Sequence, residues 1–178
     1  TGATNQTACE EGTYNPNSGS TSDADCIDAS PGYYVPTAGS ANQTAASPGY
    51  YVNDTGSASQ TACAAGTYQP SYAQTSCLNA SPGYYVDSSA APNQTPCSPG
   101  TYQPNNASTS CIDASAGYYV SGSASTNQNP CSLGTYQPYN ASTSCIDASA
   151  GYYVSGSAST SQTACSPGTY QSNHGQTS

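Results

Sequence analysis

A glycine followed two residues later by a tyrosine returns along the whole chain, and this period limits what the chain can fold into. From Gly32 onward each step is 17 residues, whereas the first step, from Gly12 to Gly32, is 20 and contains a three-residue insertion. Self-similarity at a short fixed period is the signature of repeat proteins, in which neighbouring repeats complete one another's cores. The glycines are Gly12, Gly32, Gly49, Gly66, Gly83, Gly100, Gly117, Gly134, Gly151 and Gly168.

Two kinds of module mostly alternate, so the full repeat is 34 residues long. One kind begins Gly-Thr-Tyr, as at Gly100, and is accompanied by cysteines; we call it the cysteine module. The other begins Gly-Tyr-Tyr-Val, as at Gly117, and has no cysteine; we call it the valine module. Residues 97–130 and 131–164 differ at only five positions, which indicates tandem duplication.

The first cysteine of each cysteine module marks the predicted repeat boundaries. We expect 1–8 to be the end of a truncated repeat and 9–62 to be a first repeat with the three-residue insertion and an extra 17-residue module. Three full repeats follow at 63–96, 97–130 and 131–164, and a further truncated repeat at 165–178. We therefore expect the sequence to be part of a longer secreted or surface protein.

The cysteines have fixed positions within their modules. One lies three residues before the glycine, and a second lies eleven residues after it in the regular modules, whereas valine modules carry Ala and Gln at these two positions. Because the two cysteines appear and disappear together, we predict disulfides within modules rather than links such as Cys26–Cys63. The predicted pairs are Cys9–Cys26, Cys63–Cys77, Cys97–Cys111 and Cys131–Cys145, and Cys165 is expected to pair with a residue beyond Ser178.

This cysteine spacing favours disulfides over metal or redox chemistry. Structural zinc sites need clustered ligands, typically with Cys-x-x-Cys pairs, and the sequence contains no such pair. Disulfides persist in oxidising compartments and stabilise small secreted domains that lack a large core. The predicted location is therefore extracellular or at the cell surface.

The sequence Cys97-x-x-Gly100-x-Tyr102, followed by Cys111, resembles the cysteine-rich repeats of the tumour necrosis factor receptor and ephrin-receptor-like family. In that family a further cysteine commonly stands three residues after the second one, where this chain has Ala29 after Cys26. The resemblance implies stacked, mostly irregular and short-stranded modules that form a rod. In receptors of that kind the rod binds protein ligands.

We expect a small disulfide-rich tandem-repeat rod, mostly irregular, with short β-strands and no helices; the alternative is a β-solenoid with 17-residue coils. Ile, Leu and Val number only ten in 178 residues, and Phe, Met and Trp are absent. The predicted core therefore combines the disulfides, the valines, the aliphatic residue after the second cysteine (Ile27, Leu78, Ile112, Ile146) and one tyrosine per module. These tyrosines are Tyr14, Tyr34, Tyr51, Tyr68, Tyr85, Tyr102, Tyr119, Tyr136, Tyr153 and Tyr170.

The polar surface contains candidate modification sites. Asn-x-Ser/Thr sequons predict N-glycosylation, with O-glycans on Ser and Thr as a second route, although polar turns also generate sequons without modification. Asp28, Asp113 and Asp147 recur two residues after a cysteine, which predicts Asx turns, with a Ca²⁺ site as the weaker alternative. The sequon asparagines are Asn5, Asn42, Asn53, Asn79, Asn93, Asn106 and Asn140.

The charge composition narrows the function. The chain has no Lys or Arg and a net charge of −9, so it cannot neutralise phosphates, which argues against nucleic acid as a partner. No apolar run is long enough for direct membrane insertion. We predict a non-enzymatic, cofactor-free structural protein, a strand or subunit of a glycosylated surface filament, stalk or matrix fibre, whose partners are further copies of the repeat in a homopolymer and covalent glycans. The alternative is the ligand-binding repeat ectodomain of an adhesin or receptor.

Overall fold

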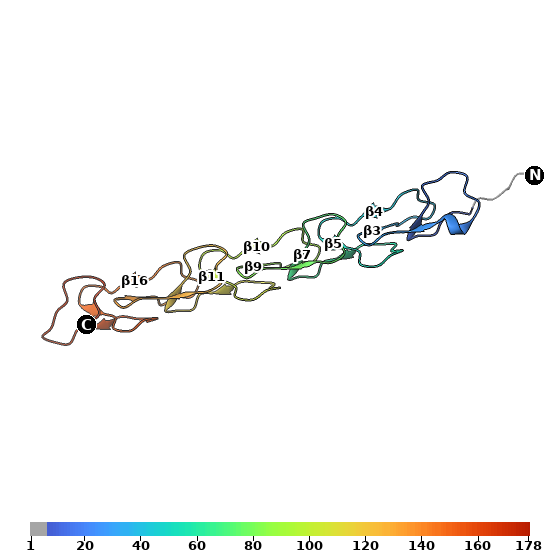
Figure 1. Ribbon diagram of the computed structural model, residues 1–178. Coiled ribbons are helices and arrows are strands. Elements are labelled where there is room, and N and C mark those ends of the chain that lie inside the picture. The colour runs from blue at the N-terminus through green and yellow to red at the C-terminus, as the bar shows by residue number, and fades with distance from the viewer. Residues whose placement is uncertain (1–6) are drawn as a thin grey trace, which may run out of the picture. The chain divides into compact units, whose positions relative to one another are not determined.

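The computed structural model describes residues 7–178 and builds them from short antiparallel strand pairs (Figure 1). A long loop connects the two strands of each pair, and a short turn connects one pair to the next. Within these residues there is no α-helix, and a single 3-10 turn, η1 (Asp23–Asp25), lies in the longer loop of the first module. The protein is therefore a small disulfide-rich tandem repeat with short strands, as the sequence predicts. The prediction of no helices is confirmed for these residues, in which η1 is a single three-residue turn.

Each hairpin lies inside one module. In cysteine modules the tyrosine is opposite the aliphatic residue after the second cysteine, as Tyr102 is opposite Ile112. This antiparallel pairing makes the β-solenoid alternative wrong, since solenoid coils pair in parallel with their neighbours. The strand pairs are β1 (Thr13–Tyr14) with β2 (Ile27–Asp28), β3 (Tyr33–Tyr34) with β4 (Thr44–Ala45), β5 (Tyr50–Tyr51) with β6 (Thr61–Ala62), β7 (Thr67–Tyr68) with β8 (Leu78–Asn79), β9 (Tyr84–Tyr85) with β10 (Thr95–Pro96), β11 (Thr101–Tyr102) with β12 (Ile112–Asp113), β13 (Tyr118–Tyr119) with β14 (Asn129–Pro130), β15 (Thr135–Tyr136) with β16 (Ile146–Asp147), and β17 (Tyr152–Tyr153) with β18 (Thr163–Ala164).

A tight turn leads into each hairpin, and the segment Ser98–Thr101 shows how the sequence encodes it. The Thr101 N–H donates to the Ser98 carbonyl oxygen at 3.0 Å, and Gly100 between them has a φ of 89°. A type II turn requires positive φ at its third residue and favours proline at its second, which here is Pro99. The Thr101 hydroxyl donates to the same carbonyl at 2.8 Å, so the threonine of cysteine modules reinforces the turn.

The described residues form two compact units that take alternate stretches of the chain. The first contains residues up to Ala80 together with Val86–Gln94, and the second contains Ser81–Tyr85 together with Thr95–Ser178. Local bonds explain the alternation. Strand β9 pairs with β10 in the second unit, whereas the Ala90 N–H donates to the Cys63 carbonyl oxygen in the first.

Backbone hydrogen bonds join consecutive modules within each unit. Between the modules of Gly100 and Gly117 they run from Gly100 N–H to Val120 O (2.8 Å), from Gln103 N–H to Ser125 O (3.0 Å) and from Ala124 N–H to Cys97 O (2.8 Å). In the first unit the equivalent bonds run from Gly49 N–H to Gln69 O (2.7 Å), from Val52 N–H to Gln74 O (2.9 Å) and from Ala73 N–H to Ala46 O (2.9 Å). Because side chains take no part in them, these junctions suit both module types.

The seventh residue after each module glycine adopts a left-handed backbone. It is Gly19, Gly39, Gly56 or Gly175 in four modules, whereas in six others it is alanine with φ between 53° and 58°: Ala73, Ala90, Ala107, Ala124, Ala141 and Ala158. Its carbonyl oxygen lies against the glycine two modules earlier, so that a Cβ on Gly100 would overlap the Ala141 oxygen, and one on Gly32 the Ala73 oxygen. Contacts therefore reach beyond the adjacent module.

The core is made of small side chains that lie close to the backbone. From Gly32 to Gly151 the residue three before each module glycine and the residue three after it are buried, as Ala114 and Val120 are in the valine module of Gly117. The tyrosines predicted for the core are half-buried from Tyr14 to Tyr153, and Tyr170 is 88% exposed.

The prediction that Ile27, Leu78, Ile112 and Ile146 lie in the core is wrong, because they are 41–48% exposed. The interior is already filled by the alanines, cysteines, valines and glutamines that flank each glycine. An aliphatic side chain such as Ile112 is therefore left opposite its cross-strand tyrosine on the outer side of the hairpin.

Replacing Gly100 with alanine is expected to lower the free energy of unfolding by about 1–3 kcal/mol, because the new Cβ meets backbone and φ is positive. Thermal unfolding followed by circular dichroism measures the loss. Gly122→Ala is the matched control, since Gly122 is exposed, does not have positive φ and has only the Ser125 hydroxyl at 3.9 Å from the added Cβ. Equal stability of the two variants would contradict the role of the backbone contact.

Candidate functional site

Four disulfides close the loops of the cysteine modules, and they join the residues that the spacing pairs. Cys9–Cys26 spans 17 residues, while Cys63–Cys77, Cys97–Cys111 and Cys131–Cys145 each span 14. The first cysteine of each pair is buried and the second is half-buried. Cys165 has no disulfide partner among residues 7–178, so its pairing with a residue beyond Ser178 stays a prediction.

Valine modules close the same loop with a glutamine. The Gln side-chain oxygen, at the position of the second cysteine, accepts a hydrogen bond from the backbone N–H two residues before the glycine. We call this contact the glutamine bridge; it spans 13 residues, nearly the span of the disulfide. The bridges are Ser30 N–H to Gln43 Oε1 (2.8 Å), Ser47 to Gln60 (2.8 Å), Ser115 to Gln128 (2.7 Å) and Ser149 to Gln162 (2.7 Å).

A second glutamine is buried in cysteine modules, three residues after the glycine, where valine modules have Val. Gln69, Gln103 and Gln137 are only 4–6% exposed. Gln103 donates through Nε2 to the Ser110 carbonyl oxygen at 2.7 Å and accepts from the Asn105 N–H at 3.1 Å, which holds the loop that leads to the second cysteine. A buried amide needs such partners at both ends. The sequence shows that these glutamines recur at the same position of the module, but it does not show that they are buried.

Six of the predicted N-glycosylation asparagines lie in the described part of the chain, and all six are exposed: Asn42, Asn53, Asn79, Asn93, Asn106 and Asn140. Asn5 lies outside the described residues. Asn140 accepts a hydrogen bond from the Ala116 N–H through Oδ1 at 2.8 Å, which leaves Nδ2, the atom that carries an N-glycan, outside that bond. Their exposure gives glycans room on the folded surface.

The recurring aspartates are strand residues, so the prediction of Asx turns is wrong. Asp28, Asp113 and Asp147 end β2, β12 and β16, and each is exposed and opposite a threonine. In an Asx turn the carboxylate would accept from the N–H two residues later, but those N–H groups, of Ser30, Ser115 and Ser149, donate to glutamine side chains instead. Among residues 7–178 no three His, Cys, Asp or Glu side chains come together as metal ligands.

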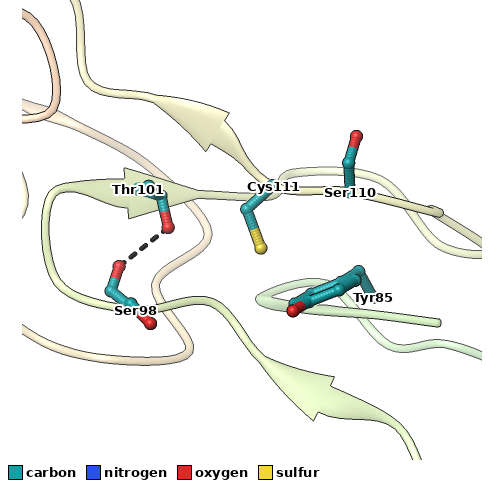
Figure 2. A pocket seen from close by; sticks show the side chains of 5 residues that line it. All are labelled: Tyr85, Ser98, Thr101, Ser110 and Cys111. Atoms are coloured by element: carbon teal, nitrogen blue, oxygen red, sulfur yellow. Dashed lines mark hydrogen bonds between the residues drawn. The ribbon is translucent and has the colours of Figure 1, made fainter. Parts of the chain in front are cut away.

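A shallow depression beside the disulfide recurs in both compact units. Figure 2 shows one, lined by Tyr85, Ser98, Thr101, Ser110 and Cys111. Its equivalent in the first unit is lined by Tyr51, Ala62, Ala64, Thr67, Ser76 and Cys77. In each, the half-buried second cysteine lies between a turn and the tyrosine of the preceding module. The depression therefore gives solvent access to one sulfur of the disulfide.

No protein-family model and no curated protein matches this chain. The resemblance to tumour necrosis factor receptor and ephrin-receptor-like repeats stays a prediction, because disulfide-bonded hairpins do not by themselves identify that family. The disulfides indicate an oxidising, extracellular environment. In the part of the chain that the structure describes, no helix has the length and apolar character needed to cross a membrane.

Replacing Gln60 with alanine is expected to destabilise the protein by about 1 kcal/mol, because the partly buried Ser47 N–H loses its acceptor. Urea unfolding measures the loss, and hydrogen exchange of the Ser47 amide, followed by NMR, should accelerate. Gln60→Glu is the control, since its carboxylate keeps an acceptor at the same place. Unchanged exchange in Gln60→Ala would show that the bridge does not hold the loop.

Proposed function

We propose that this chain is a structural extracellular tandem-repeat protein, a strand or subunit of a glycosylated surface filament, stalk or matrix fibre. The observation that carries the proposal is the junction between modules. It consists of the same backbone hydrogen bonds in both compact units, so a rod of such modules would gain length simply by adding repeats.

The surface supports this proposal. The exposed sequons would place glycans on successive repeats, and the acidic residues give the chain one sign of charge. Glycans and uniform charge both keep an extended protein soluble. The proposed partners are further copies of the same repeat, in a homopolymer, and the covalent glycans; the proposed role requires no catalysis.

One observation favours the alternative, a ligand-binding ectodomain of an adhesin or receptor. Two of the five positions that distinguish residues 131–164 from residues 97–130 hold exposed apolar side chains: Leu133 is 54% exposed and Tyr139 is 71% exposed. The preceding repeat has Pro99 and Asn105 there. Such a difference between near-identical repeats is what a dedicated binding surface would require. Under this alternative, Leu133→Pro with Tyr139→Asn would abolish adhesion of the source cells.

Electron microscopy of native material tests the structural proposal. We expect uniform filaments that an antibody against this chain decorates along their whole length. Decoration limited to isolated molecules at a membrane, with no filaments, would favour the receptor alternative.

Mass spectrometry tests glycosylation separately. Enzymatic release of N-glycans converts the modified asparagine to aspartate, so peptides that contain Asn42, Asn93 or Asn106 should gain about one mass unit relative to the sequence. Peptides made with a protease specific for aromatic residues are needed, since the chain has no Lys or Arg for trypsin. Asn105, which precedes a sequon without belonging to one, is the internal control. Unmodified asparagine at all described sequons would rule out N-glycans.

A further inference from the structure

We propose that the two ways of closing a loop give the chain a fixed, redox-controlled limit of extension. Under tension, valine modules would supply the length that extends, and each disulfide would hold back the loop of its cysteine module until it is reduced. The inference rests on the proposed structural function, because only a load-bearing protein would use such a limit.

The two module types share one backbone frame. The junction bonds are of the same kind and nearly the same length in both: Gly100 N–H donates to Val120 O at 2.8 Å, and Gly117 N–H donates to Gln137 O at 2.7 Å. The difference between the modules that matters under tension is the closure of the loop. In one it is the covalent Cys97–Cys111 bond, and in the next it is the hydrogen bond from Ser115 to Gln128.

These closures respond differently to a pulling force. A hydrogen bond to a single amide breaks and reforms as the chain unravels. A disulfide carries the tension itself, so the backbone between Cys97 and Cys111 bears none of it and cannot extend. The contrast is a matter of connectivity and holds whatever force unravels the junctions.

The length held back follows from the spacing. Each 34-residue repeat contains one disulfide that bypasses 14 residues, so 20 residues remain extensible. At about 3.6 Å per extended residue, an oxidised repeat would extend to about 70 Å and a reduced repeat to about 120 Å. Reduction would thus increase the fully extended length of a repeat about 1.7-fold.

The geometry also indicates which sulfur a reductant attacks. Cys111 Sγ lines the depression in Figure 2, whereas Cys97 is 0% exposed. A thiolate from a small-molecule thiol would bond to Cys111 Sγ; the disulfide breaks, and Cys97 leaves as a thiolate that takes a proton from water. A second thiolate then attacks the external sulfur of the mixed disulfide and releases Cys111, so two thiols supply the two electrons and leave as one small disulfide.

Single-molecule force spectroscopy tests the proposal on the full chain held between two marker domains. The fully extended length per repeat should increase about 1.7-fold when a small thiol is added. Two matched variants exchange the closures. Cys97→Ala with Cys111→Gln should lengthen its repeat by about 50 Å without reductant, and Ala114→Cys with Gln128→Cys should shorten its repeat by the same amount.

Equal released lengths in oxidised and reduced chains would overturn the proposal, as would an unchanged length in the Ala114→Cys/Gln128→Cys variant once mass spectrometry shows its new disulfide. Circular dichroism checks that each variant folds. If a variant does not fold, the comparison of oxidised with reduced wild-type chains decides the question. Thiol-trapped intermediates should carry the small thiol on Cys111, and trapping on Cys97 would contradict the route. Because single chains are measured, the result does not depend on whether filaments form.

Discussion

The close contact between a glycine and the carbonyl oxygen of the left-handed residue two modules later determines much of this structure. It requires a residue without a side chain at positions such as Gly100, and it requires positive φ at positions such as Ala141. In repeat proteins each repeat contacts its nearest neighbours. Here the module after next lies in the adjacent 34-residue repeat, so this contact joins successive repeats in addition to the hydrogen bonds between successive modules.

That close backbone packing explains the unusual composition. When backbones lie this near one another, the space between them accepts Ala, Cys and Val, and it accepts Gln only where both ends of the amide find partners, as in Gln103. Large aliphatic residues have no interior position to fill, which is why Ile112 remains partly exposed. The scarcity of aliphatic side chains that would leave an ordinary domain unfolded is compatible with order here, because hydrogen-bonded backbone and disulfides replace a thick core.

Much of this was predictable from the sequence, and the failures have physical causes. The joint appearance of Cys97 and Cys111 predicts their disulfide, and the Pro-Gly pair before Thr101 predicts the turn. The role of Gln128 depends on a loop that brings it to an amide thirteen residues earlier, which no local pattern reveals. Ile112 and Asp113 differ from the prediction because they form the second strand of a thin hairpin that leaves both its faces exposed, and residue type and spacing do not reveal this exposure. Glycosylation and assembly depend on enzymes and partner chains, and the family resemblance rests on a short motif, so all three stay predictions.

The valine modules of Gly32 and Gly49 follow one another directly, without a cysteine module between them. Their junction uses the ordinary bonds, with Gly32 N–H donating to Val52 O at 2.8 Å and Val35 N–H donating to Ser57 O at 2.9 Å. Half of the 34-residue repeat can therefore be inserted without a new kind of interface. An array of such modules can therefore gain or lose modules one at a time, and each product would still fold with matching ends.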